Sequence, residues 1–352
     1  MRIALLTYSS KPRGSVVHTL ALAEALADLG QDVTVWTLGR GGDSSFYRQV
    51  DPRVTLRIVP FAAVEDVGER VLRSIAVLRE AFDPSGYDIV HAQDCISANA
   101  VGPCVRTVHH VDHFTTPELA ACHERAIVTP YRHICVSAAV AAELRAGWGI
   151  EATVIANGVD HARFATADGG PWRRKLGPYV LSVGGIEPRK GSLDLLAAYR
   201  LLGRPEVRLV IAGGETLFDY RAYRAEWDRL AASVRPAPEV LGPVADDELP
   251  ALVAGAAVFA FPSTKEGFGL AAMEALAAGV PLVARDLPVL REVFDGAARF
   301  AGSVPELAAA IGAALDGGGP VAAGRRLAAG YTWSAAAEAH LRLYRRIHEA
   351  RT

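Results

Sequence analysis

Two glutamates flank a short glycine-containing segment that could bind an anion. Glu266 precedes and Glu274 follows the residues Gly267, Phe268, Gly269 and Leu270. The pattern predicts a strand that ends at Phe261 and a helix that begins near Gly269. Backbone N–H groups at such a helix start suit a diphosphate or sugar hydroxyls, and glycine lets a ligand approach the backbone closely. Glu274 would stand about 7 Å farther along the helix axis. The two carboxylates could therefore contact different parts of one elongated ligand.

Glutamates at this spacing have a simpler interpretation, as two solvated side chains of a strand-loop-helix turn. The Gly-Phe-Gly-Leu segment between them and the sequence Ala-Ala-Gly-Val-Pro at 277–281 favour a ligand-binding loop instead. Arg189 and Lys190, which follow a predicted strand and precede a glycine, supply a planar guanidinium and a compact ammonium. Two such cations can neutralise a departing diphosphate, although adjacent basic residues often belong only to a solvated turn.

A third polar cluster lies in the first half of the chain, in Thr107-Val-His-His-Val-Asp-His113. His109 lies at the end of the predicted strand Val105–His109. Packing or surface positions are the better interpretation for His110 and His113. A metal site formed by His109, Asp112 and His113 would be chemically sensible, but we predict no metal, because the fold already accounts for the cluster. His91 and Asp94 also lie near a strand end, where they could line an acceptor pocket or simply pack.

The elements that must position these side chains alternate between strand and helix. In the first half the predicted strands are Ile3–Leu6, Val33–Trp36, Val54–Val59, Tyr87–His91, Val105–His109, His133–Val136 and Thr153–Ile155. The pattern then restarts, with predicted strands at Val180–Val183, Val207–Ile211, Val258–Phe261 and Pro281–Ala284. Such alternation indicates parallel sheets with right-handed crossovers. We therefore predict an α/β fold of two Rossmann-like, doubly wound domains that face one cleft, since ligands bind at the carboxyl ends of such strands.

The predicted domain boundaries follow from this restart. Residues 1–165 form the first domain and residues 166–333 the second, with Asp168 to Pro178 interpreted as a linker because it is rich in glycine, proline and arginine. The last helix, 334–352, has no following strand. Its apolar face, with Leu341, Tyr344 and Ile347, is predicted to pack back on the first domain.

Composition excludes several functions. The 352 residues carry a formal net charge of −2, which argues against a nucleic-acid-binding surface. The four cysteines show no metal-binding spacing and are typical of reduced thiols in a cytoplasmic protein. No segment reaches the roughly 18 apolar residues of a membrane span, and the apolar N-terminal run is too short for a signal peptide. Peripheral contact with a membrane stays open, and the oligomeric state is not indicated.

The segment from Phe261 to Glu274 resembles the donor-site signature of glycosyltransferase family 4, which are retaining enzymes of the GT-B fold. Further matching segments cover nearly the whole chain: Asn157–Asp160, Ser182–Gly191, Val210–Gly214, Leu241–Val244 and Tyr331–Trp333. The resemblance implies that Glu266 faces the donor sugar, that Glu274 binds the nucleotide ribose, and that His109 lies over the sugar. It also implies that the base is recognised mainly by backbone near Leu241 and Gly242.

The chain departs from the family pattern at two places. Relatives often carry arginine where this chain has Gly185, so Arg189 would have to replace that phosphate ligand or leave it missing. The usual glycine pair after the first strand is reduced to Gly14 followed by Ser15, which the resemblance still places near the donor phosphate.

The resemblance implies transfer of a sugar from a nucleotide-sugar co-substrate, with retention and without a metal or other cofactor. A UDP-sugar is favoured and a GDP-sugar is the alternative; the acceptor, a small or lipid-linked molecule, is not indicated. Two rival functions remain: a nucleotide-sugar epimerase or hydrolase of the same architecture, and a non-catalytic nucleotide-sugar-binding protein. The presence of Glu266, Glu274 and Lys190 weighs against the second rival.

Overall fold

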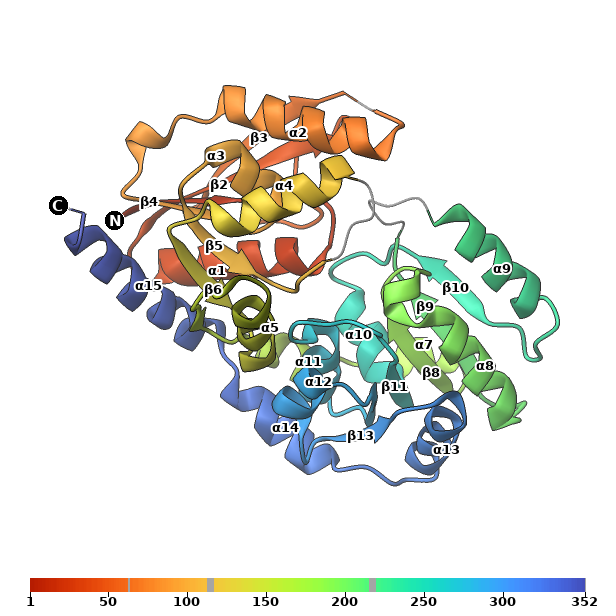
Figure 1. Cartoon of the computed structure of the whole chain (residues 1–352). Coiled ribbons are helices and arrows are strands. Elements are labelled where there is room, and N and C mark those ends of the chain that lie inside the picture. Colours follow the sequence, from red (N-terminus) through yellow and green to blue (C-terminus); the bar gives the residue numbers. More distant parts are fainter. Residues whose placement is uncertain (63, 113–116, 215–219, 352) are drawn as a thin grey trace. The chain divides into compact units, whose positions relative to one another are not determined.

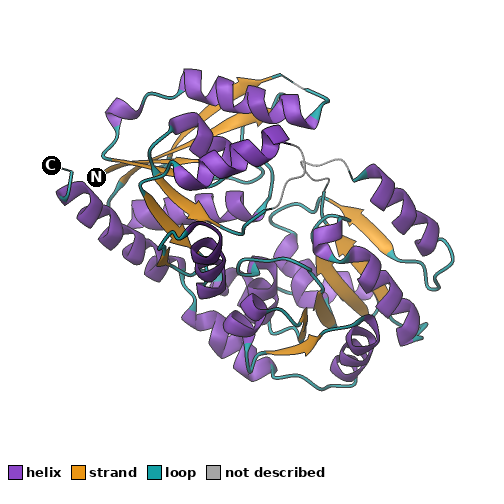
Figure 2. Cartoon of the chain, viewed as in Figure 1, coloured by secondary structure: helices purple, strands orange, loops and turns teal. Residues whose placement is uncertain are grey.

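The structure is a computed structural model that describes residues 1–62, 64–112, 117–214 and 220–351. The chain divides into two compact units (Figure 1). Unit 1 comprises Met1–Gly158 and Trp333–Thr352, and unit 2 comprises Val159–Thr332. In both units strands and helices alternate along the chain (Figure 2). No helix of the described residues is long and apolar enough to cross a membrane.

Unit 1 is built on a parallel sheet in the order β3-β2-β1-β4-β5-β6-β7. Its strands are β1 (Arg2–Leu6), β2 (Asp32–Arg40), β3 (Thr55–Phe61), β4 (Ile89–Ala92), β5 (Val105–Val108), β6 (Arg132–Cys135) and β7 (Thr153–Val154). The order reverses between β1 and β4, which is the point where doubly wound sheets bind ligands. The central strands are buried on both faces and therefore have nearly continuous apolar sequences, such as Ile3–Leu6.

Helices cover both faces of this sheet. They are α1 (Gly14–Asp28), α2 (Val67–Ala81), α3 (Cys95–Val101), α4 (Pro117–Val128), α5 (Ala138–Trp148) and α15 (Trp333–Glu349), with a short 3-10 turn, η1 (Pro84–Gly86). The last helix, α15, lies beside α1 (Figure 1). Its residues Leu341, Tyr344 and Ile347 are buried in the same apolar cluster as Leu20 of α1. The apolar face of the chain's last helix thus completes the core of unit 1.

Unit 2 is built on a second parallel sheet, in the order β10-β9-β8-β11-β12-β13. Its strands are β8 (Tyr179–Val183), β9 (Arg208–Ala212), β10 (Glu239–Gly242), β11 (Val258–Phe261), β12 (Leu282–Arg285) and β13 (Ala298–Ala301). Its longer helices are α8 (Ser192–Leu202), α9 (Arg221–Ala231), α11 (Leu270–Ala277), α13 (Val304–Leu315) and α14 (Val321–Gly330). The shorter ones are α6 (His161–Ala165), α7 (Gly170–Leu176), η2 (Pro188–Lys190), α10 (Leu249–Gly255) and α12 (Pro288–Phe294). The predicted α/β class with two doubly wound sheets is confirmed.

The structure differs from the sequence-based expectation in three places. The predicted linker at 168–178 is wrong, because Gly170–Leu176 forms α7, with its proline in the first turn, where proline is tolerated. Strands β10 and β13 were not predicted; they lie at the two edges of their sheet. The units divide after Gly158, earlier than the expected 165, because α6 packs against α10 and α11 of unit 2.

Candidate functional site

Glu266, Lys190 and Arg189 of unit 2 form one ion cluster. The Nζ of Lys190 lies 2.6 Å from Glu266 Oε1, and Arg189 Nη1 lies 3.3 Å from the same oxygen. Arg189 Nη2 also lies 3.2 Å from Glu187 Oε1. The side chains of Glu266 and Lys190 are only 10% and 19% exposed, so this pairing is largely shielded from solvent. The structure therefore brings together three of the predicted site residues, and Arg189 does not point away into solvent.

The local backbone explains why two segments far apart in the chain meet here. Lys190 ends η2, and Gly191 follows with a φ of +64°, in the left-handed region. A Cβ on Gly191 would lie 2.2 Å from the carbonyl oxygen of Pro262, so only glycine permits this close approach. Thr264 then donates its N–H to the carbonyl of Arg189 at 2.8 Å. The loop after β11 is thereby fixed against the basic pair.

The electrostatics of Glu266 follow from this arrangement. Burial would raise its pKa, but the neighbouring Lys190 and Arg189 outweigh that effect and hold the pKa at about 2. Lys190 Nζ also lies 5.4 Å from the centre of the Phe261 ring, a cation–π contact. Glu266 is consequently an ionised hydrogen-bond acceptor at neutral pH, and a poor candidate for a proton donor.

Glu274 lies in a different environment, as a half-buried residue of α11. Its carboxylate accepts no hydrogen bond from any residue that the structure describes. Burial raises its pKa to about 8; Arg163 opposes this rise, and Asp246 and Asp160 add to it. Arg163 is itself hydrogen-bonded to Asp246. Glu274 is thus a half-buried carboxyl group that accepts no hydrogen bond from the described residues.

The other residues of the predicted loop have mixed environments. Gly269 caps α11 with a φ of +98°, and a Cβ there would lie 2.9 Å from the ring of Phe294. Phe268 is buried, with its ring centre 5.5 Å from that of Tyr331. Gly267 is buried and Leu270 is half-buried. Phe268 therefore anchors the loop that leads into α11.

Leu241 and Gly242 end the edge strand β10. Gly242 has a φ of +70°, and its carbonyl accepts a hydrogen bond from Gly213 at 2.8 Å. A Cβ on Gly213 would in turn lie 2.3 Å from the backbone of Gly184. These glycines let the ends of β8, β9 and β10 approach one another at the carboxyl edge of the sheet.

In unit 1, the half-buried His109 lies beside the buried His18. Its ring centre lies 4.8 Å from that of His18, edge to face, and its Nε2 has no hydrogen-bond partner among the described residues. Burial lowers the pKa of His109 to about 3, and His110 and Arg106 contribute to the shift. The imidazole is therefore neutral at physiological pH, and it can position a ligand by hydrogen bonding but not by charge.

Sequence reasoning missed the residues around His109. His18 is 1% exposed, and its Nδ1 lies 2.8 Å from Asn157 Oδ1. His340, on α15, is fully buried, with its ring centre 6.0 Å from that of His18. The available signal for His18 was a histidine among the apolar residues that became α1. No local signal pointed to His340, because it comes from the far end of the chain.

His91 is a packing residue, not part of an exposed pocket lining. It is fully buried, and its two ring nitrogens lie 2.6 Å from the Tyr344 hydroxyl and 2.8 Å from that of Thr107. Asp94 caps α3 through its bond from the backbone N–H of Ser97.

Gly14 and Ser15 begin α1, and a Cβ on Gly14 would meet nothing within 4 Å. His110 Nε2 lies 3.1 Å from Asp112 Oδ1. The third member of the considered metal set, His113, lies outside the described residues. Among the residues described, no group of three histidine, cysteine or acidic side chains is placed to hold a metal ion.

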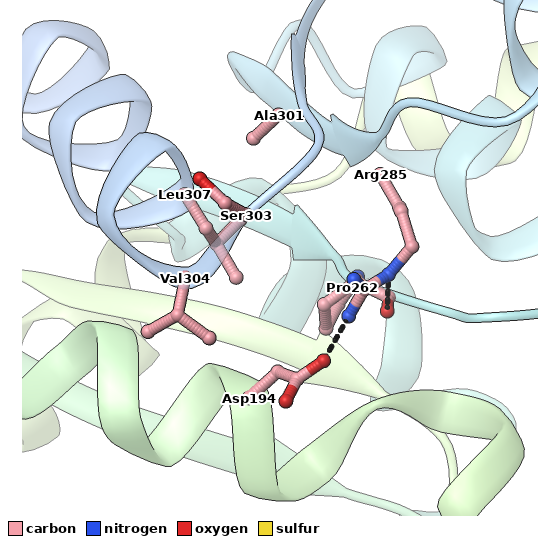
Figure 3. A pocket seen from close by; sticks show the side chains of 7 residues that line it. All are labelled: Asp194, Pro262, Arg285, Ala301, Ser303, Val304 and Leu307. Carbon is pink, nitrogen blue, oxygen red and sulfur yellow. Dashed lines mark hydrogen bonds and ion pairs between the residues drawn. The ribbon is translucent and has the colours of Figure 1, made fainter.

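A small pocket of unit 2 contains none of the predicted site residues (Figure 3). It is lined by Asp194, Pro262, Arg285, Ala301, Ser303, Val304 and Leu307. Its cation is already neutralised, because Arg285 lies 2.5 Å from Asp194 and donates to the Pro262 carbonyl at 2.8 Å (Figure 3). Arg285 therefore links α8 to the loop after β11.

Comparison with known proteins gives consistent matches to sugar-transferring enzymes. Residues 12–163 match the model of Glycosyltransferase Family 4, and residues 172–317 match that of Glycosyl transferases group 1. The chain is 31% identical to the phosphatidyl-myo-inositol mannosyltransferase of Mycolicibacterium smegmatis, over 96% of this chain and 92% of the relative. It is 29% identical to a glycogen synthase of Mycobacterium tuberculosis, over 98% and 94% of the two chains.

Solved structures share the fold. The sucrose-phosphate synthase of Thermosynechococcus elongatus aligns with a TM-score of 0.81 at 20% identity, over 99% of both chains. The Anabaena protein HepE, solved in complex with UDP and glucose, aligns with a TM-score of 0.77 at 21% identity, over 97% of this chain and 99% of that one. The architecture is thus that of GT-B glycosyltransferases. On the strength of these matches, the chain belongs to glycosyltransferase family 4.

Proposed function

We propose that this glycosyltransferase transfers a hexosyl group from a UDP-sugar to an acceptor, with retention of the anomeric configuration and without a metal ion. A GDP-sugar is the alternative donor. The observation that carries the proposal is the pairing of Lys190 and Arg189 with Glu266 beside the N-terminus of α11, with the unused carboxyl of Glu274 on the same helix. HepE, of the same fold, was solved with UDP-glucose.

The roles follow from charge and position. The diphosphate would lie at Lys190, Arg189 and the start of α11, where the cations and the helix dipole stabilise the negative charge that grows as the glycosidic bond breaks. Without a donor, the carboxylate of Glu266 is paired with the ammonium of Lys190. An incoming diphosphate would therefore compete with Glu266 for this ammonium. Glu266 would then accept hydrogen bonds from sugar hydroxyls. Because its carboxylate is held by two cations, it is a weak nucleophile.

Two further groups complete the proposed donor site. Glu274, with no hydrogen-bond partner of its own among the described residues, would accept hydrogen bonds from the ribose hydroxyls as its carboxylate form. The base would contact backbone near Leu241 and Gly242. In unit 1, neutral His109 would orient the donor sugar by hydrogen bonding, with Gly14 and Ser15 near the donor phosphate.

The test is a panel of nucleotide sugars in a thermal-shift assay, followed by incubation of the best donor with candidate acceptors. A new glycoside whose anomeric proton coupling matches that of the donor supports retention, and unchanged rates in EDTA support metal independence. Donor consumption without acceptor would indicate an epimerase or hydrolase instead. Binding without turnover in the presence of every acceptor tested would indicate a non-catalytic binding protein.

A further inference from the structure

Glu187 is a buried acid in the loop between β8 and α8 of unit 2. It is 6% exposed and is the N-cap residue of η2. The side chain of a residue in this position usually accepts a hydrogen bond from the first backbone N–H groups of the helix, but Glu187 makes no such capping bond. Its Oε1 accepts a hydrogen bond from Nη2 of Arg189 at 3.2 Å instead. The buried carboxylate therefore serves the guanidinium and not the helix end.

Arg189 is held by two carboxylates, one at each terminal nitrogen. Nη2 lies against Glu187, and Nη1 lies 3.3 Å from Glu266 Oε1. In the proposed function Glu266 turns to the hydroxyls of the donor sugar, so Glu187 is the acid that would still hold the guanidinium. The planar fork of arginine allows this, because one nitrogen can stay on a carboxylate while the other donates to a phosphate oxygen.

The neighbouring cation, Lys190, is held in a different way. A Cβ on Gly184 would lie 3.3 Å from Cδ and Cε of Lys190, so the lysine stem packs on the backbone of Gly184. The ammonium also contacts the ring of Phe261. The side chain of Arg189 is more exposed, at 32% against 19% for Lys190. A long side chain that is not already fixed loses conformational freedom when it binds a ligand, and this loss lowers the affinity.

We propose that Glu187 is a positioning residue for sugar transfer, which holds Arg189 so that its Nη1 faces the donor diphosphate. Glu187 itself contacts no substrate and acts only through the guanidinium. This inference rests on the proposed function, because it deepens the assignment of the diphosphate to Lys190 and Arg189.

The test is calorimetric titration of UDP into the whole protein, with variants that separate the reach of Glu187 from its charge. Glu187→Asp keeps the charge but shortens the side chain by one methylene, and it should weaken UDP binding at least about fivefold. Glu187→Gln loses the charge but keeps the length and an acceptor oxygen, so it should bind UDP at least as tightly as wild type. An effect of charge alone would change the affinity in Glu187→Gln and leave Glu187→Asp unaltered, which would overturn the inference.

The same substitution in an Arg189→Ala background tests whether Glu187 acts through Arg189. There Glu187→Asp should change UDP affinity by less than about twofold, because the group that it positions is gone. The matched control is Glu338→Asp, which shortens an exposed carboxylate paired with Arg342 on α15 of unit 1, and it should leave UDP binding unchanged. If Glu187→Asp fails to fold, Glu187→Ala is compared with Glu187→Gln, and the alanine variant should bind UDP more weakly because it lacks the acceptor.

Equal UDP affinity in wild type and Glu187→Asp, or the same loss with and without Arg189, would overturn the inference. Lys190→Ala separates this failure from that of the proposed function. Weaker UDP binding in Lys190→Ala would keep the diphosphate at the ion cluster even where Glu187 proves to have no part in it. Unchanged UDP binding in Lys190→Ala would remove the diphosphate from the cluster and overturn both.

Discussion

The two units bury polar side chains in opposite ways. In unit 1 four imidazoles are uncharged at neutral pH, because removal from solvent lowers the pKa of each of His18, His91, His109 and His340. In unit 2 the buried Glu266 stays ionised, because Lys190 and Arg189 lie against it. Both arrangements avoid an unpaired buried charge. The difference indicates that removal of one member of the ion cluster should impair unit 2. Protonation of the histidines at low pH should instead destabilise unit 1.

Removal of Lys190 is the most direct way to break the unit 2 arrangement. We expect Lys190→Ala to lower kcat by roughly 100- to 1,000-fold, because the developing charge on the diphosphate loses its closest cation. Binding of UDP should weaken as well. Lys175→Ala, on α7, is the matched control and should behave as wild type. Arg189→Ala should show a smaller loss, and full activity of both Lys190→Ala and Arg189→Ala would place the diphosphate elsewhere.

Removal of Glu266 from the same cluster should lower kcat without lowering the affinity for UDP. We expect Glu266→Ala to lower kcat by about 100-fold, since hydrogen bonds to the sugar are lost. UDP lacks the sugar, and Lys190 is freed from its partner, so the affinity for UDP should not fall. Calorimetry with UDP and initial rates with the donor sugar measure the two effects. A UDP affinity that falls as far as kcat would contradict the assigned role.

Substitution of Glu274 tests whether unit 2 also contains a group that titrates near neutral pH. We expect Glu274→Ala to weaken UDP binding by about 10- to 100-fold, the range for lost hydrogen bonds to a charged group. Because only the carboxylate accepts both ribose hydroxyls, and the folded-state pKa is about 8, wild-type affinity for UDP should rise with pH up to that value. The slope should be at most about tenfold per pH unit.

Glu274→Gln is the control for this pH dependence, since it keeps the shape and removes the titration. Any pH dependence of UDP binding that remains in Glu274→Gln can be assigned to titration of UDP itself. Identical pH profiles for wild type and Glu274→Gln would rule out a protonated resting state of this carboxyl.

The smallest effect concerns stability in acid. Histidines whose folded-state pKa lies below the unfolded value of 6.5 take up protons first in the unfolded chain. The free energy of unfolding is therefore highest above pH 6.5. It falls as the pH decreases toward about 4 for His340 and about 3 for His109. Calorimetry should show a falling Tm over this window, at about 2–4 °C per kcal/mol. His340→Phe should flatten the fall, whereas His161→Gln in unit 2 should not.

Most of the fold could be predicted because its determinants are local. Continuous apolar runs such as Ile3–Leu6 and Val258–Phe261 mark strands buried on both faces, and the helices between them require parallel sheets. The failures also have local causes. Gly170 and Pro171 signal a break, yet both residues fit the first turn of α7. Strand β13, Ala298–Ala301, is short and contains two alanines, so its pattern is weak.

The candidate site was predictable only in part, because its pairings connect distant residues. The loop from Glu266 to Glu274 could be identified from its own sequence. The ion pair between Lys190 and Glu266 joins two loops that only the strand order brings together. Likewise, His340 reaches His18 through the return of α15, and no residue near either one encodes that contact.

The return of α15 to unit 1 has a consequence for biosynthesis. Unit 2 is one uninterrupted stretch of chain, whereas the core of unit 1 includes Leu341 and Tyr344, which follow unit 2 in the sequence. On the ribosome, synthesis of unit 2 is therefore complete before synthesis of unit 1 is complete. At ~5–20 residues per second, the apolar residues of α1 that pack against α15 stay uncovered in a nascent unit 1 for roughly ten seconds or more. Recognition by chaperones is accordingly expected to concentrate on α1 and its neighbouring strands, and to end when α15 emerges.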